Sequence, residues 1–119
     1  MSAEAPAPFS HPVEAEFARI LDFYGIPWEY EPRTFVLTRD RENRVTEAFS
    51  PDFYLPDQDL YVELTTMQPK QIRHKNRKLR LLRQLYPEIN IRLFKRGDIR
   101  NLLLKFGIED VPDMMANEL

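Results

Sequence analysis

The sequence predicts an α/β domain in which a mixed four-stranded sheet is flanked by helices. Two observations lead to this prediction. Apolar residues at helical spacing precede and separate short runs that are rich in the aromatic and β-branched residues typical of strands. A long helical segment lies between the third run and the fourth, as the crossover between two parallel strands requires. The predicted element order is αβββαβ, followed by a C-terminal helix.

Composition predicts one domain with a tail at each end. Residues 1–10 are rich in Ala and Pro and are expected to be a disordered tail, residues 11–107 form the domain, and residues 108–119 form an acidic C-terminal tail. The chain has no cysteine and only two histidines, which argues against disulfides and zinc sites. It has no long apolar run and no leader-like segment, so we expect neither a membrane span nor a signal peptide. A cytoplasmic protein is expected.

The first helix is predicted to begin after Ser10, a candidate N-cap, and to end at Gly25. Pro12 suits its first turn. Glu14 and Glu16 lie at the two edges of its apolar stripe, where simple solvation is the usual explanation for a glutamate. The stripe itself recurs at helical spacing and consists of Val13, Phe17, Ile20, Leu21 and Tyr24.

The strands are predicted where aromatic and β-branched residues cluster between turn residues. Pro32 is expected to kink or bulge the first strand, and the polar segment Thr38–Thr46 is expected to connect it to the second as a hairpin. Pro51 in the second strand indicates a strand start or a sheet edge. The four predicted strands are Trp28–Leu37, Glu47–Leu55, Leu60–Thr66 and Asn90–Phe94.

Two carboxylates are conspicuous in the predicted sheet. By the two-residue strand period, Asp52 and Glu63 each point away from the apolar face of their strand. Glu63 lies in a short, apolar strand that is expected to be central, where an unpartnered carboxylate is costly to bury. It therefore needs a metal, a base or solvent at a cleft. The structural alternatives are that Glu63 pairs with Lys75 or Arg73, and that Asp52 caps a turn after Pro51.

A long basic helix is predicted from Gln68 to Tyr86, ended by Pro87. Lys75 falls within its inner stripe, about 60° from Ile72. There it can either cover the core with its aliphatic stem or point into an acidic site. The rest of the stripe is Leu79, Leu82 and Tyr86, and the cations on the flanks and the outside are Lys70, Arg73, Arg77, Lys78, Arg80 and Arg83. Asp98 is expected to cap a last helix that carries Ile99, Leu102, Leu103 and Phe106 and ends at Gly107.

Charge is strongly segregated along the chain, although the total is only −2. Residues 1–67 carry a net charge of −8, residues 68–105 carry +10, and residues 106–119 carry −4. Such asymmetry favours a cationic face that attracts a polyanion, and the basic helix would supply phosphate contacts without sequence readout. The alternative is a solvated basic helix that is neutralised by the acidic half of the chain.

Two segments in this order resemble the PD-(D/E)XK nuclease superfamily, which has the restriction-endonuclease-like fold. The segment SPDFYLP at 50–56 is similar to the PD motif of its small resolvase-like and endonuclease-like members, and YVELT at 61–65 is similar to the (D/E)XK strand. The first helix around Glu14 and the WEYEP segment at 28–32 are similar to the elements that precede these motifs. The resemblance covers residues 12–106.

The resemblance implies a metal-dependent nuclease that hydrolyses phosphodiester bonds, with DNA as the expected substrate. It makes Asp52 and Glu63 metal ligands, Glu14 a third ligand, and the main-chain carbonyl of Leu64 a further oxygen donor. Hard oxygen ligands suit Mg²⁺ or Mn²⁺, which would activate a water and neutralise charge on the scissile phosphate. For so small a chain, cutting both strands of a duplex would require a homodimer.

Thr65 departs from the family pattern, because it stands where the motif lysine is expected. One interpretation is that the lysine has moved to the following helix, with Lys75 as the catalytic ammonium and Lys78 as a less well aimed substitute. The other is that the site is inactive and the domain only binds nucleic acid or a protein partner. The joint presence of three carboxylates and an inward-facing lysine favours the first interpretation.

Overall fold

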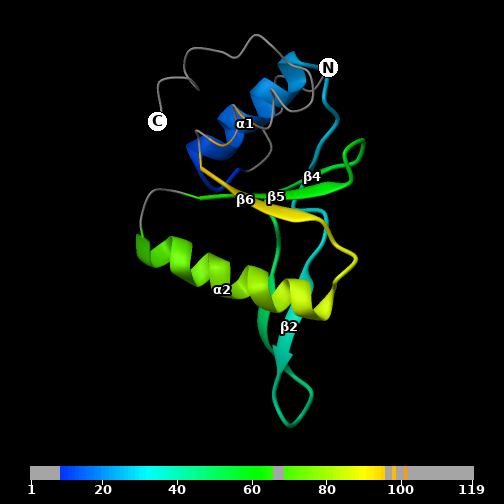
Figure 1. Ribbon diagram of the computed structural model, residues 1–119, viewed down its shortest axis with the longest axis vertical. Coiled ribbons are helices and arrows are strands. Elements are labelled where there is room, and N and C mark those ends of the chain that lie inside the picture. The colour runs from blue at the N-terminus through cyan, green and yellow to red at the C-terminus, as the bar shows by residue number, and fades with distance from the viewer. Residues whose placement is uncertain (1–8, 66–68, 96–97, 99–100, 102–119) are drawn as a thin grey trace.

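The computed structural model describes residues 9–65, 69–95, 98 and 101. Within these residues the chain forms an α/β domain with a mixed four-stranded sheet, as the sequence predicts, and a separate two-stranded sheet (Figure 1). The elements in chain order are α1 (Pro12–Phe23), β1 (Glu29–Tyr30), β2 (Phe35–Arg39), β3 (Val45–Phe49), β4 (Phe53–Leu55), β5 (Leu60–Leu64), α2 (Pro69–Leu85) and β6 (Ile91–Phe94).

The larger sheet has the order β1-β4-β5-β6. The β1–β4 and β4–β5 pairs are antiparallel, and β5 and β6 are parallel. The chain segment between β5 and β6 contains α2, so the predicted helical crossover between parallel strands is confirmed. β5 lies between two other strands and all of its five residues are buried, which confirms that the strand of Glu63 is central.

The two helices cover opposite faces of this sheet (Figure 1). Side chains alternate along β5 as the two-residue period predicts. Leu60, Val62 and Leu64 belong to the buried cluster that includes α1. Tyr61 instead belongs to the cluster that includes Leu79 of α2. The odd-numbered residues of β5, including Glu63, therefore face α2.

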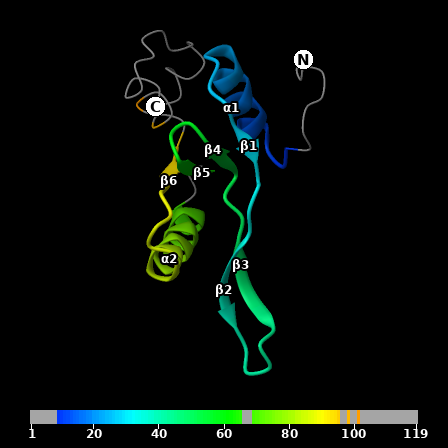
Figure 2. The same ribbon diagram turned by 90° about the vertical axis from the view of Figure 1, so that its right-hand side faces the viewer.

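The structure corrects the first two predicted strands, because each is broken into two. Residues 31–34 separate β1 from β2, and residues 50–52 separate β3 from β4. The breaks coincide with Pro32 and Pro51, which have no N–H to donate to a ladder. β2 and β3 pair only with each other and form what we call the arm, residues 35–49. The arm extends from the four-stranded sheet away from α1 (Figures 1 and 2).

The arm is also longer than the sequence predicts. Its strands include Thr38 and Thr46, which were expected in the hairpin connection. The two hydroxyl oxygens are 2.7 Å apart and share a hydrogen bond across the strands. The true connection is shorter, and the Asp40 carboxylate stabilises it by accepting the backbone N–H groups of Glu42 and Arg44. β-branched pairs of this kind stabilise a ladder, which explains the extension.

The start of α1 also differs from the prediction. The N-cap is His11 rather than Ser10, and its side chain makes no capping bond. Phe9, which the sequence assigns to the N-terminal tail, packs its ring against Tyr30 with centroids 4.7 Å apart. The predicted end of the helix is confirmed, since Gly25 follows it with φ of 70°, a conformation that glycine adopts without strain.

Several predicted features lie outside the described residues. They are residues 1–8 of the N-terminal tail, Thr66, Gln68, most of the C-terminal helix (Ile99, Leu102, Leu103, Phe106 and its stop Gly107) and the acidic tail at 108–119. Among the residues that are described, no helix is long and apolar enough to cross a membrane.

Candidate functional site

The fold buries three carboxylates that the sequence singled out. Glu14 of α1, Asp52 at the entry to β4 and Glu63 of β5 are 3%, 7% and 5% exposed. Glu16 is buried as well, so the expectation that the glutamates at the edges of the first helix are simply solvated is wrong for both. Carboxylates are rarely buried without partners, and the partners of these three define the site.

Asp52 and Glu63 hold each other in place across two neighbouring strands. The backbone N–H of Asp52 donates to Glu63 Oε1 at 3.1 Å. The backbone N–H of Leu64 donates in turn to Asp52 Oδ2 at 2.9 Å. The alternative that Asp52 caps a local turn is therefore replaced by a bond across the sheet. Each carboxylate is fixed by the backbone of the other strand.

Lys75 reaches this pair from α2. Its Nζ lies 2.9 Å from Glu63 Oε2 and donates to the Leu64 carbonyl oxygen at 2.6 Å. The side chain of Lys75 is 27% exposed, whereas that of Glu63 is 7% exposed. Helical periodicity thus predicted the direction of Lys75 correctly, and of the two basic partners proposed for Glu63 the structure selects Lys75 rather than Arg73.

Glu14 is positioned by contacts that the sequence does not reveal. Its Oε1 accepts the Tyr30 hydroxyl at 2.7 Å and the Ser10 backbone N–H at 3.1 Å. Burial and the bond to Glu14 raise the pKa of Tyr30 to about 12. Tyr30 was predicted only as a strand residue, and no sequence signal marks its contact with Glu14. That contact exists because β1 lies at the edge of the sheet beside α1.

The electrostatics of the pair favour protonation or a bound cation. Burial raises the pKa of Asp52 to about 8, and the charges of Glu63 and Glu14 add to the increase, while the Leu64 N–H and Lys75 oppose it. Burial also raises the pKa of Glu63, against the opposing effect of Lys75. Ionising both of these neighbouring buried carboxylates costs free energy unless a further positive charge is present.

The available donors are chemically suited to a hard divalent cation. Glu14 and Asp52 each commit one oxygen to the hydrogen bonds above, whereas Glu63 accepts the Asp52 N–H through Oε1 and contacts Lys75 through Oε2. The Leu64 carbonyl adds a neutral oxygen beside Glu63. The Lys75 ammonium contacts both Glu63 and Leu64, so one positive charge is already present between them. Within the described residues, however, no cluster of three acidic, histidine or cysteine side chains forms a ready-made metal cage.

Thr65 carries no charge toward this site. It is 7% exposed and its backbone N–H donates to the Phe94 carbonyl at 2.9 Å. Lys78, the alternative lysine, lies 3.4 Å from the Ala48 carbonyl oxygen of the arm. Of the two lysines considered as replacements, only Lys75 is therefore in contact with a carboxylate of the site.

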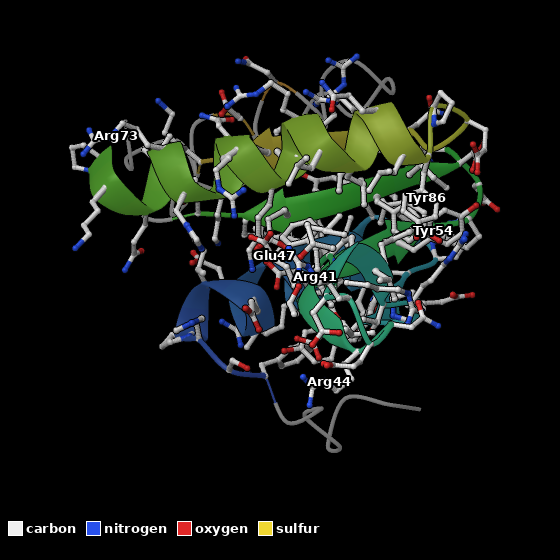
Figure 3. All side chains as sticks on the ribbon, turned by 90° about the horizontal axis from the view of Figure 1, so that it is seen from below. Arg41, Arg44, Glu47, Tyr54, Arg73 and Tyr86 are labelled. Carbon is white, nitrogen blue, oxygen red and sulfur yellow. The ribbon has the colours of Figure 1, made fainter. Side chains whose placement is uncertain are left out.

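The predicted nucleic-acid-binding cations of α2 divide into two groups. Arg77 pairs with Glu47 of the arm, and Arg83 donates to the Ile91 carbonyl at 3.0 Å. Together with Lys78 they tie α2 to the rest of the fold. Lys70, Arg73 and Arg80 are exposed and make no hydrogen bond or ion pair with another described residue. Figure 3 shows Arg73 at the opposite end of α2 from Tyr86, with Glu47 between them in this view.

No protein-family model, curated protein or solved structure matches this chain. Function is therefore inferred from the geometry of the chain's own residues. That geometry comprises two interlocked buried carboxylates, a carbonyl oxygen beside them, an ammonium group that contacts Glu63 and Leu64 of β5, and a buried carboxylate from α1.

Proposed function

We propose that this protein is a metal-dependent nuclease of the PD-(D/E)XK type, which hydrolyses phosphodiester bonds in DNA. The interlocked burial of Asp52 and Glu63 on adjacent strands carries the proposal. A core gains nothing from two carboxylates whose pKa is raised by burial, because replacing buried charges with apolar residues is often stabilising. A divalent cation accounts for their presence, since it is stabilised by the same two negative charges.

The order of the elements supports the same assignment. α1, β1, β4, β5, α2 and β6 follow the αβββαβ order, with three antiparallel strands and then a parallel fourth. The arm is an insertion between the first and second of these strands. Asp52 directly before β4 and Glu63 in β5 are the residues to which the resemblance assigns the two motif carboxylates, and their contact across these strands supports the proposal.

The proposed roles follow from the contacts. Asp52, Glu63 and the Leu64 carbonyl would hold Mg²⁺ or Mn²⁺, with Glu14 as the third carboxylate. The cation would activate a water and neutralise charge on the phosphate. Tyr30 keeps Glu14 in position through its hydroxyl. Lys75 supplies, from α2, the positive charge that Thr65 does not provide.

The direct test is cleavage of labelled DNA in duplex, branched and single-stranded forms. We expect products with Mg²⁺ or Mn²⁺ and none when EDTA is added. Branched and single-stranded substrates are included because nothing in the site selects one of the three forms. A folded protein that cuts none of them with either metal would contradict the proposal.

A second candidate is a nucleic-acid-binding module without catalysis. Thr65 at the lysine position favours it, as does the complete pairing of Lys75 with Glu63 and Leu64. In that case the ion pair is purely structural. This candidate predicts salt-sensitive binding of DNA that is indifferent to divalent cations and to chelators.

Both candidates predict that the outward cations of α2 contact phosphates. Replacing Lys70, Arg73 and Arg80 together by alanine should lower the slope of log Kd against log salt by about 2 to 3, because each phosphate contact contributes roughly 0.9 on duplex DNA. Fluorescence anisotropy over a series of KCl concentrations measures this slope. The matched control is Arg44→Ala, since Arg44 lies in the arm and pairs with Asp40. An unchanged slope in the triple variant would place the DNA on another surface.

A further inference from the structure

Lys75 makes contacts that a bound metal ion would also make. Its Nζ lies within 2.9 Å of Glu63 Oε2 and 2.6 Å of the Leu64 carbonyl oxygen. Both oxygens belong to the donor set assigned above to a divalent cation. The ammonium is therefore in the place of the cation rather than beside it.

Two cations cannot share these oxygens. A Mg²⁺ ion needs oxygen ligands at about 2.0–2.1 Å, and an ammonium that remained bonded to the same two oxygens would be strongly repelled by it. The oxygens are held in place, because the Leu64 carbonyl belongs to the central strand β5 and the buried Glu63 carboxylate accepts the Asp52 N–H. The lysine can move, since it ends a flexible four-carbon stem and is 27% exposed.

Charge balance points to the same exchange. When both buried carboxylates, Asp52 and Glu63, are ionised, Lys75 contributes one positive charge against their two negative charges. A divalent cation would neutralise both carboxylates. The ammonium would then lose the electrostatic attraction that holds it between Glu63 and Leu64.

We propose that Lys75 is a tethered cation that occupies the metal position in the metal-free protein and is released when a divalent cation binds. The inference rests on the proposed function and deepens it. Release turns the ammonium from an internal ion-pair partner into a free positive charge at the rim of the site, where it can meet a phosphate. The lysine would thus become available for substrate only once the metal is in place.

The first experiment follows the amine of Lys75 in the unaltered protein. The protein is treated briefly with an acylating reagent, with and without saturating Mn²⁺, and modification of each lysine is quantified by mass spectrometry. Acylation of Lys75 should rise several-fold with Mn²⁺, while that of the exposed Lys95 should not change. If Lys75 is equally protected in the two states, the inference is wrong.

The second experiment measures Mn²⁺ binding by calorimetry in the wild type and in Lys75→Met. Removal of the competing ammonium should tighten binding by roughly tenfold or more, because a unit charge no longer has to be displaced from the same oxygens. The matched control, Lys95→Met, should bind as the wild type does. Equal or weaker Mn²⁺ binding by a folded Lys75→Met variant would overturn the inference.

The two experiments separate failure of this inference from failure of the proposed function. Mn²⁺ binding without any change at Lys75 refutes the tethered cation alone. Mn²⁺ binding with release of Lys75, in a protein that cleaves no DNA, refutes the nuclease and supports the tethered cation. If Mn²⁺ binds to neither protein, both are refuted.

Discussion

Glu63→Gln is expected to reduce metal-dependent DNA cleavage by at least about a hundredfold, since loss of even an outer-shell partner of a metal site typically costs 10–100-fold. Glutamine keeps an oxygen for the Asp52 N–H and fills nearly the same volume. The fold should therefore persist while the charged ligand is lost. Single-turnover cleavage at saturating Mn²⁺ measures the effect, and circular dichroism checks the fold.

The control for this variant is Glu29→Gln. Glu29 is an exposed glutamate of β1 in the same sheet, outside the site, and its loss should leave the cleavage rate unchanged. If Glu63→Gln cleaves at nearly the wild-type rate, Glu63 is not a metal ligand. Its contact with Lys75 is then the structural ion pair that the sequence offered as the alternative.

The metal-free protein is expected to lose stability as pH rises from about 4 to about 8, chiefly because of Asp52. Its pKa is raised to about 8 in the folded state by burial and by Glu63, against 3.8 as the ordinary value. Between these values the folded chain holds a proton that the unfolded chain has released, so rising pH favours unfolding. The free energy of unfolding should fall by up to about 1.4 kcal/mol per pH unit and level off above pH 8.

Asp52→Asn should remove most of this pH dependence and make the metal-free protein more stable at pH 8 than the wild type. The asparagine carbonyl can still accept the Leu64 N–H, so the neutral side chain keeps the strand contact. Urea unfolding over a range of pH, without metal, measures both effects. The control is Asp57→Asn at an exposed position, which should keep the wild-type slope.

Mn²⁺ should oppose the loss of wild-type stability at rising pH. It binds the ionised carboxylate, so its stabilising effect should grow as pH rises toward 8. The same stabilisation should be largely absent in Asp52→Asn. A wild-type slope that survives in Asp52→Asn would show that another group carries the pH dependence, and Glu63, whose pKa is also raised, would be the next to test.

Local periodicity predicted the parts of the site that depend on the direction of a side chain. The two-residue period placed Glu63 on the face of β5 opposite Val62, and the helical period placed Lys75 on the inner side of α2. Both directions are as predicted, because they depend only on residues within one element. The mixed sheet with its crossover helix was predictable for a different reason, because a helix between two strands favours their parallel pairing.

Features that depend on pairing between distant segments were not predictable in this way. Pro32 indicated a kink, but nothing local shows that the strand breaks completely and that the arm leaves the sheet. Arg77 and Arg83 were assigned to nucleic acid, but their partners Glu47 and Ile91 lie elsewhere in the chain. An exposed helix face and one that is tied to an arm have the same sequence pattern.

The sequence by itself determined that this chain forms an α/β domain, that Glu63 lies in its central strand, and that the helix after this strand carries an inward lysine. Only the tertiary structure decided that Asp52 and Glu63 lock together, that Glu14 is buried against Tyr30, and that the ammonium rests on both Glu63 and Leu64. Periodicity sets the direction of a side chain within its own element. The distance between two elements is set by how the sheet and helices pack, and the chemistry of this site depends on that distance.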